Sequence, residues 1–230
     1  MKRKYSPSAI KTYESCPKKY DLGYNQNIWP PPGAPDHFTA FGYIIHEIAE
    51  HYTGNNPKNA IKIVNKYKQY LTDEFKLELL PTIKNLYKWC DKNIKDDTLR
   101  EYRLELKEDD LWIGGIIDDL MPDRKLFTDY KSGYPATERH MFQMKLYATI
   151  LYKKWKCEPK DIKCILYYPK VDVQDFIMFK NKEIYDFEKE LKEKINEIEN
   201  RKEWPEQPGF HCRWCDYQTM KLCKTGEKHD

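Results

Sequence analysis

Residues 114–133 constrain the fold of this chain more than any other part of its sequence. Within this stretch an apolar run leads into Asp118, a turn with a proline follows, and a second apolar run leads into Asp129 and Lys131. Short apolar runs separated by a turn are typical of adjacent β-strands. If the two strands are neighbours, the carboxylates of Asp118 and Asp129 meet at one point of the sheet. Lys131 shares a strand face with Asp129, because side chains alternate along a strand.

Two carboxylates and a lysine on adjacent strands provide the groups that metal-assisted cleavage of a phosphodiester requires. Carboxylates prefer hard cations such as Mg²⁺ or Mn²⁺ and leave coordination positions for water and phosphate oxygens. The backbone carbonyl of Tyr130 can add a further oxygen ligand. Lys131 is placed to orient an attacking water or to stabilise charge in the transition state. Strand-end acids with a lysine as salt-bridge partner are also common on protein surfaces, so this pattern alone leaves both interpretations open.

Three other residues compete for a role at this metal site. Asp119 is expected to point to the face opposite to Asp118, and Asp123 lies in the proline-containing turn, so both are weaker candidates. His46 is a stronger one, because it lies on a helix expected over residues 38–52 and imidazole is a ligand for such cations. A lone helical histidine is nevertheless more often a packed or surface residue.

A change of hydrophobic period along the chain predicts an α/β fold with a central mixed sheet flanked by helices. Helical spacing dominates residues 1–98, strand patterns follow in residues 99–181, and residues 182–230 hold an amphipathic helix and a cysteine-rich tail. Two helices are expected within residues 57–95, with the break near Pro81. The length of 230 residues suits a single domain made of these three parts.

Composition limits the partners that this chain can have. Its 40 Lys and Arg residues nearly balance 37 Asp and Glu residues, so contact with nucleic acid would need local basic patches. Eighteen tyrosines, nine phenylalanines and six tryptophans offer rings that can stack on unpaired bases. No apolar run has the length of a membrane span, and no apolar segment of a signal peptide follows the basic start. We therefore expect no membrane partner and a cytoplasmic location, or the host cytoplasm for a viral protein, where thiols stay reduced.

Reduced thiols direct attention to metal binding by the cysteine-rich tail. A Cys-x₂-Cys turn there directs two sulfurs toward one metal, in zinc sites as in iron–sulfur sites. Cys16, in a helix expected to extend to about residue 20, is the better candidate for the missing fourth ligand. His211 is adjacent to a cysteine and poorly placed, and His229 is nearly terminal. The three local thiols are those of Cys212, Cys215 and Cys223.

The motifs described above, taken in their order along the chain, resemble those of the PD-(D/E)xK nucleases and, within that family, of the RecB-like branch. The resemblance implies a restriction-endonuclease-like core in which His46, Asp118 and Asp129 bind Mg²⁺ or Mn²⁺ and Lys131 is the catalytic lysine. It also implies that the Gln-x₃-Tyr motif, Gln143 and Tyr147, contacts the substrate; the two residues lie one helical turn apart on a single face. The matching segments are 6–20, 42–47, 115–118, 129–133 and 143–147.

The resemblance extends to the cysteines. RecB-like nucleases of the AddB type, and related CRISPR-associated and viral exonucleases, bind a 4Fe–4S cluster through one early cysteine and three near the C-terminus. The resemblance therefore implies a 4Fe–4S cluster on Cys16, Cys212, Cys215 and Cys223. A zinc site on the same ligands is the alternative. Such a cluster would connect the first helix to the tail. The other cysteines are expected to be buried thiols: Cys90, Cys157 and Cys164.

By resemblance, the expected function is that of a metal-dependent DNA exonuclease acting on single strands or DNA ends, in repair, recombination or replication. The sequence has no Gly-x₄-Gly-Lys-Ser/Thr phosphate loop, so we expect either a stand-alone nuclease or one subunit of a larger machine with a helicase as partner. Two alternatives remain open. One is a non-enzymatic nucleic-acid-binding module held together by iron–sulfur or zinc. The other is a nuclease with endonuclease activity that processes ends in CRISPR spacer acquisition with an integrase-type partner.

Overall fold

A computed structural model describes residues 3–31, 33–54, 56–108 and 111–224 of the chain. The chain divides into two compact units, each made of segments that are distant in sequence. One, here called the sheet unit, comprises Ala34–Glu105 and Gly115–Phe187. The other, here called the cysteine unit, comprises Met1–Gly33, Leu106–Gly114 and Glu188–Asp230.

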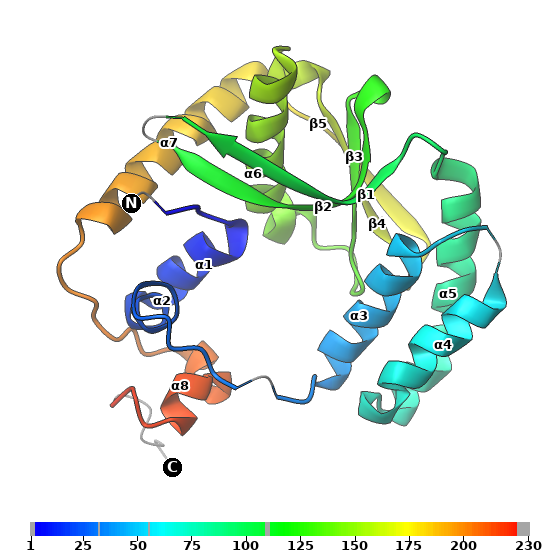
Figure 1. Ribbon diagram of the computed structural model, residues 1–230, viewed down its shortest axis with the longest axis horizontal. Helices are drawn as coiled ribbons and strands as arrows, with labels where there is room; N and C mark the ends of the chain where they lie inside the picture. Colours follow the sequence, from blue (N-terminus) through cyan, green and yellow to red (C-terminus); the bar gives the residue numbers. More distant parts are fainter. Residues whose placement is uncertain (1–2, 32, 55, 109–110, 225–230) are drawn as a thin grey trace. The chain divides into compact units, whose positions relative to one another are not determined.

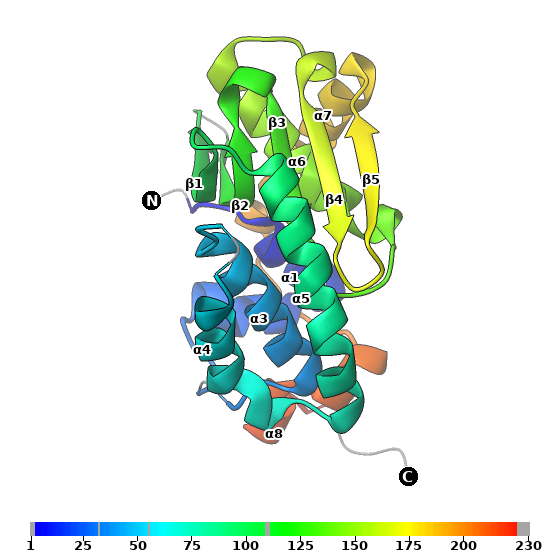
Figure 2. The ribbon, with the colours of Figure 1, turned by 90° about the vertical axis from the view of Figure 1, so that its right-hand side faces the viewer.

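A five-stranded mixed sheet is the centre of the α/β fold, as the sequence predicted (Figures 1 and 2). The strands follow one another in sequence order across the sheet. β3 pairs with β2 and β5 pairs with β4 in antiparallel fashion, whereas β3 and β4 are parallel. The strands are β1 (Leu99–Lys107), β2 (Trp112–Met121), β3 (Leu126–Tyr130), β4 (Lys163–Tyr168) and β5 (Val173–Met178).

Helices cover both faces of this sheet. Helices α3, α4 and α5 pack together on one face, where they share a buried apolar cluster with Tyr130 and Tyr167 of the strands (Figures 1 and 2). Helix α6 covers the other face, where its Tyr147 ring lies 6.0 Å from the ring of Phe127. Phe127 and Tyr130 point to opposite faces because side chains alternate along a strand. The helices are α1 (Pro7–Ser15), α2 (Pro17–Tyr20), α3 (His37–Glu50), α4 (Pro57–Tyr67), α5 (Asp73–Asn93), α6 (Thr137–Trp155), α7 (Asn181–Asn200) and α8 (Asp216–Thr219).

Two predicted helix boundaries were wrong. Helix α5 continues through Pro81, although an internal proline removes one backbone hydrogen bond and costs roughly 3 kcal/mol. Buried side chains on both sides of Pro81, including Leu79 and Ile83, anchor the helix in the core and offset this cost. The N-terminal helix, in contrast, breaks at Cys16, whose backbone is extended because the next residue is proline.

Among the described residues, no helix is both long and apolar enough to cross a membrane.

Candidate functional site

An acidic centre lies in the sheet unit, where strands β2 and β3 separate. Their pairing ends at Asp119 and Thr128, and continuation of this register places Asp118 opposite Asp129. The backbone N–H of Tyr130 donates a hydrogen bond to Asp118 Oδ2 at 2.6 Å. The Asp118 carboxylate therefore takes the place of the next backbone acceptor in the ladder, and this bond holds the side chain where the pairing of β2 and β3 ends.

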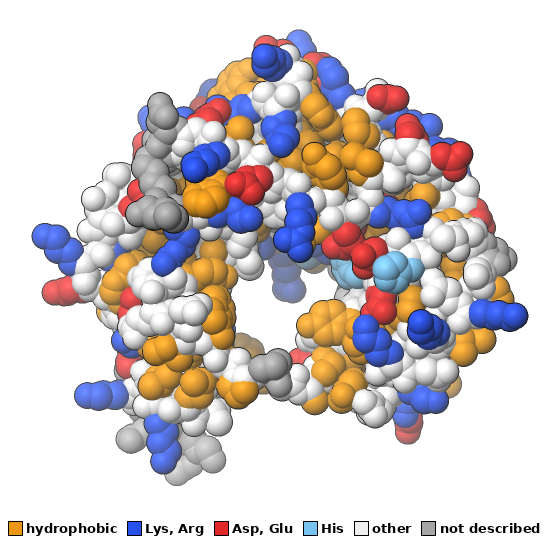
Figure 3. All heavy atoms as spheres, viewed as in Figure 1, with side chains coloured by type: hydrophobic (Ala, Val, Ile, Leu, Met, Phe, Trp, Pro, Cys, Tyr) orange, Lys and Arg blue, Asp and Glu red, His pale blue; other side chains and the backbone are white. Residues whose placement is uncertain are grey.

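Helix α3 brings His46 to the same point. Its Nδ1 lies 3.2 Å from Asp118 Oδ1. Burial lowers the pKa of His46, but the negative charges of Asp118 and Asp129 outweigh this effect and raise the pKa to about 9. The end of α3 is held by Arg100, which donates to the backbone carbonyl of Glu50 at 2.9 Å and so satisfies a helix-terminal acceptor. In Figure 3, histidine and acidic side chains gather over the upper part of α3.

Glu101 is a residue of this centre that the sequence did not reveal. It offers a carboxylate oxygen that lies within 4.8 Å of ligand atoms of both His46 and Asp118. Burial raises the pKa of Glu101, and the charges of Asp118 and Glu50 raise it further. Its φ of 46° lies in the left-handed region, which is sparsely populated by residues other than glycine and costs backbone strain. An acid in an alternating strand carries no signal of such a bend.

Lys131 and Asp129 are held together in a hydrogen-bonded network with helix α6. Lys131 Nζ lies 2.6 Å from Asp129 Oδ2. The amide of Gln143 accepts from Lys131 at 3.2 Å and donates to Asp129 Oδ1 at 3.0 Å. Burial raises the pKa of Asp129, as does the charge of Asp118, whereas Lys131 lowers it. The prediction that Lys131 and Asp129 share a strand face is confirmed by this contact.

Tyr147 completes the network from inside the protein. The Gln143 amide lies 3.0 Å from the Tyr147 hydroxyl, which donates to the backbone carbonyl of Ile116 at 2.7 Å. Gly115 makes room for the ring, since a Cβ atom there would lie 2.5 Å from Tyr147 Cε1. Tyr147 is only 3% exposed, so these contacts indicate that it positions the Gln143 amide. The predicted contact of Gln143 and Tyr147 with substrate stays a prediction.

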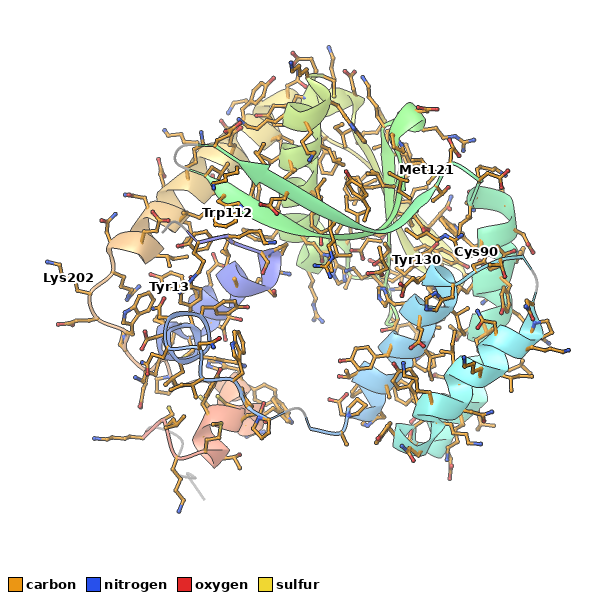
Figure 4. All side chains as sticks on the ribbon, viewed as in Figure 1. Tyr13, Cys90, Trp112, Met121, Tyr130 and Lys202 are labelled. Atoms are coloured by element: carbon orange, nitrogen blue, oxygen red, sulfur yellow. The ribbon has the colours of Figure 1, made fainter. Side chains whose placement is uncertain are left out.

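Asp119 and Asp123, the two weaker candidates for the metal site, lie away from Asp118 and His46. Asp119 is buried on the opposite face, as predicted, and accepts a short hydrogen bond from the hydroxyl of Tyr130. Burial raises the pKa of Asp119 to about 7. The Tyr130 hydroxyl also lies 4.0 Å from the sulfur of Cys90, and both residues are labelled in Figure 4. Asp123 lies in the turn Pro122–Arg124 that joins β2 to β3.

The donors of the acidic centre suit a hard divalent cation. His46, Asp118 and Glu101 offer one imidazole nitrogen and two carboxylate oxygens that lie within 4.8 Å of one another, and Mg²⁺ and Mn²⁺ prefer such oxygen ligands. Asp129 is not in this group, and its carboxylate is held by Lys131 and Gln143. Its role as a metal ligand stays a prediction. A role of the Tyr130 carbonyl as a ligand stays a prediction.

A second candidate centre lies in the cysteine unit, where a single pocket contains the sulfurs predicted to bind a cluster. None of these cysteines forms a disulfide. Four thiols around one pocket are the donor set of both iron–sulfur and structural zinc sites. The pocket is lined by Cys16, Gln207, His211, Cys212, Cys215, Gln218 and Cys223.

Aromatic packing and backbone hydrogen bonds bring the tail to the N-terminal helices. The ring of Trp204 stacks on Tyr20 at 5.6 Å and meets Tyr13 edge-on at 6.1 Å. The N–H of Lys18 donates to the carbonyl of Pro205 at 3.1 Å. Cys16 thereby faces the tail from the break between α1 and α2, where its sulfur also accepts the N–H of Lys19.

The structure corrects two predictions, one about the cysteine unit and one about the sheet unit. His211, which was expected to be poorly placed, lines the pocket, and its Nε2 is buried with no hydrogen-bond partner among the described residues. Gly209 leaves the space for its ring, since a Cβ there would lie 2.9 Å from His211 Cε1. Cys90 and Cys164 are buried as predicted, but Cys157 is half-buried because it lies in the turn after α6. His229 lies outside the described residues.

Comparisons with known proteins agree with this arrangement. A family model of the PD-(D/E)XK nuclease superfamily matches residues 4–223. A crystal structure of a protein from Eubacterium rectale, named as a candidate exonuclease, superposes with a TM-score of 0.64 at 10% identity and covers 99% of this chain and 90% of that one. At this identity the likeness concerns the fold alone. No curated protein matches the sequence.

Proposed function

Because the chain belongs to the PD-(D/E)XK nuclease superfamily, we propose that it is a metal-dependent DNA exonuclease that acts on single strands or DNA ends. The observation that carries this proposal is the convergence of Asp118, Asp129 and Lys131, with His46, at the point where β2 and β3 separate. A role in repair, recombination or replication, with a helicase or an integrase-type protein as partner, is part of the same proposal.

The residues of the acidic centre have distinct tasks in this mechanism. Asp118, Asp129 and His46 would hold Mg²⁺ or Mn²⁺, which when bound supplies Lewis-acid activation of the phosphate and of the attacking water. Lys131 keeps a positive charge beside Asp129 and can donate a hydrogen bond to a phosphate oxygen, stabilising the charge that develops there. Gln143 orients Lys131, because its amide oxygen accepts from the ammonium at 3.2 Å while its nitrogen is engaged with Asp129.

Digestion of end-labelled linear and circular single-stranded DNA tests this proposal. With Mg²⁺ or Mn²⁺, we expect the linear strand to be degraded from an end and the circle to stay intact. Lys131→Ala should slow degradation by about 10²- to 10³-fold. Lys125→Ala, which removes an exposed lysine paired with Asp161, should leave the rate unchanged. Equal activity of wild type and Lys131→Ala would contradict the mechanism. Cutting of the circle would contradict the exonuclease, and DNA binding without any cleavage would favour a non-enzymatic module.

The second part of the proposal is a 4Fe–4S cluster on Cys16, Cys212, Cys215 and Cys223. It is supported by the pocket that these four cysteines line together. A cluster there would bind the first helices to the tail, and its role would be mainly structural.

Anaerobic purification followed by visible absorption and by iron, sulfide and zinc analysis tests the cluster. We expect a brown protein that contains iron and sulfide, and a colourless product of Cys212→Ala. Cys157→Ala is the matched control, because this cysteine lies outside the pocket. Zinc without sulfide would contradict the cluster and show that zinc is bound instead.

A further inference from the structure

Two exposed aromatic rings lie on segments that also carry residues of the acidic centre, and neither ring is used by the mechanism above. Phe38, near the start of α3, is 65% exposed, and Tyr134, in the segment between Lys131 and α6, is 62% exposed. Burying a ring of this size would stabilise the fold by about 1.5–3 kcal/mol, so exposure of both forgoes a sizeable contribution. Figure 3 shows hydrophobic side chains open to the surface along the first half of α3.

Contacts beneath these rings fix them in place and join them into one surface. Phe38 meets the buried Phe75 edge-on, with ring centroids 5.2 Å apart. The ammonium of Lys170 lies 5.1 Å from the Phe75 ring and 4.6 Å from the Tyr134 ring. Lys170 is itself held by Glu78 at 2.8 Å. The exposed rings therefore rest on an ordered base of one aromatic ring and one paired cation.

The position of this surface relates it to the acidic centre. Tyr134 follows Lys131 by three residues. Ser132 lies against α3 at Gly42, where a Cβ would be 3.4 Å from its hydroxyl. Phe38, Gly42 and His46 follow one another at helical spacings of four residues along α3. Phe38 is thus about 12 Å from His46 along the helix axis.

We propose that Phe38 and Tyr134 form a base-stacking platform for unpaired nucleotides next to the cleaved phosphate, which makes the enzyme selective for single-stranded DNA. This inference rests on the proposed nuclease function and names its substrate class. Aromatic side chains bind unpaired bases of any sequence through their π-faces. Bases of a duplex already stack on each other and cannot offer both faces. Lys170 is a positioning residue in this arrangement, since its charge is paired with Glu78 and its ammonium holds the Tyr134 ring.

Binding of short fluorescein-labelled strands, measured by anisotropy in Ca²⁺ with a gel to show that the DNA stays intact, tests the platform. Two single strands are compared, one with bases throughout and one with abasic sugars at successive internal positions, together with a duplex. We expect wild type to bind the normal strand at least tenfold more tightly than either the abasic strand or the duplex. The double variant Phe38→Ala/Tyr134→Ala should lose this difference, and Tyr134→Phe should keep it.

Phe176→Ala is the matched control, because Phe176 is 55% exposed on the edge strand β5 and makes none of the contacts above. Thermal melting of each variant shows whether it is folded. Equal affinity of wild type for normal and abasic strands overturns the platform, as does a double variant that retains the difference. Degradation of DNA with no base dependence of binding would leave the nuclease standing and remove only this inference. Base-dependent binding without degradation would support the platform and contradict the nuclease.

Discussion

The acidic centre and the four-cysteine pocket are two candidate metal sites built in opposite ways. In the first, hydrogen bonds from Tyr130 and Gln143 already hold Asp118 and Asp129 in place. In the second, sulfur is a weak hydrogen-bonding group, and the ligands come from segments at the two ends of the described chain. The acidic centre should therefore keep its geometry without a metal, whereas the cysteine unit should depend on its metal for order.

The largest expected effect is on catalysis at the acidic centre. Lys131→Ala should lower kcat by about 10²- to 10³-fold, because it removes a positive charge from beside the reacting phosphate. The melting temperature should fall as well, because the buried Asp129 loses its paired cation, so rates are compared at a temperature at which both proteins are folded. Rates and thermal melting measured on the same preparation check this. If the loss of activity is no larger than the loss of folded protein explains, the catalytic role of Lys131 is contradicted.

At the cysteine pocket the expected effect is on stability. Cys212→Ala should remove the metal and lower the melting temperature by roughly 10 °C, because metal binding contributes directly to folding in such sites. Cys157→Ala, outside the pocket, should melt close to wild type. Calorimetry of metal-loaded and chelator-treated protein checks this. If chelation leaves the melting temperature unchanged, the pocket does not depend on a metal.

A smaller effect is expected where the acidic centre is supported from behind. Gly115→Ala would place a Cβ at 2.5 Å from the Tyr147 ring, and such overpacking costs about 1–3 kcal/mol. Displacement of Tyr147 should also disturb Gln143 and lower kcat. Gly133→Ala is the matched control, because no described atom beyond its two chain neighbours lies within 4 Å of the added Cβ. Denaturation curves and rates of the two variants check this, and identical behaviour would show that the tight contact has no consequence.

Glu101 gives a narrower test of how the acidic centre binds a cation. Glu101→Gln keeps the shape of the side chain but removes a charge near His46 and Asp118, so affinity for Mn²⁺ should fall by about 10- to 100-fold. Glu105→Gln, on the exposed part of the same strand, should bind as wild type does. Isothermal titration calorimetry without DNA checks this independently of activity. Unchanged affinity would exclude Glu101 from the site.

We also expect a pH dependence, with opposite signs for metal binding and for stability. The pKa of His46 is raised from 6.5 to about 9 in the metal-free protein, so a cation must displace its proton. Mn²⁺ affinity should rise by about tenfold per pH unit up to pH 9 and then level off. The ion pair of protonated His46 with the Asp118 carboxylate stabilises the fold. The part of this stabilisation that depends on the His46 proton is complete below pH 6.5 and is lost as the pH rises through 9. His46→Asn should flatten both curves in titration and melting experiments.

Much of the fold was predictable because it is encoded in local patterns. The apolar runs that lead into Asp118 and Asp129 predicted two adjacent strands, which the structure has as β2 and β3. The same alternation predicted that Asp119 faces away from Asp118, which its contact with Tyr130 confirms. The continuity of α5 through Pro81 was not predictable, because it depends on buried neighbours that outweigh a local preference.

The sequence by itself determined which chemical groups the protein has and on which strand face they lie, because side-chain period is a property of the local backbone. It thereby supplied Asp118, Asp129 and Lys131 as a set, and with the family resemblance it added His46 and the four cysteines. Only the tertiary structure decided which distant groups meet. Spacing along a chain sets no distance between elements that fold back on each other, so the approach of Glu101 to His46, the network of Gln143 and the place of His211 in the pocket required the folded arrangement.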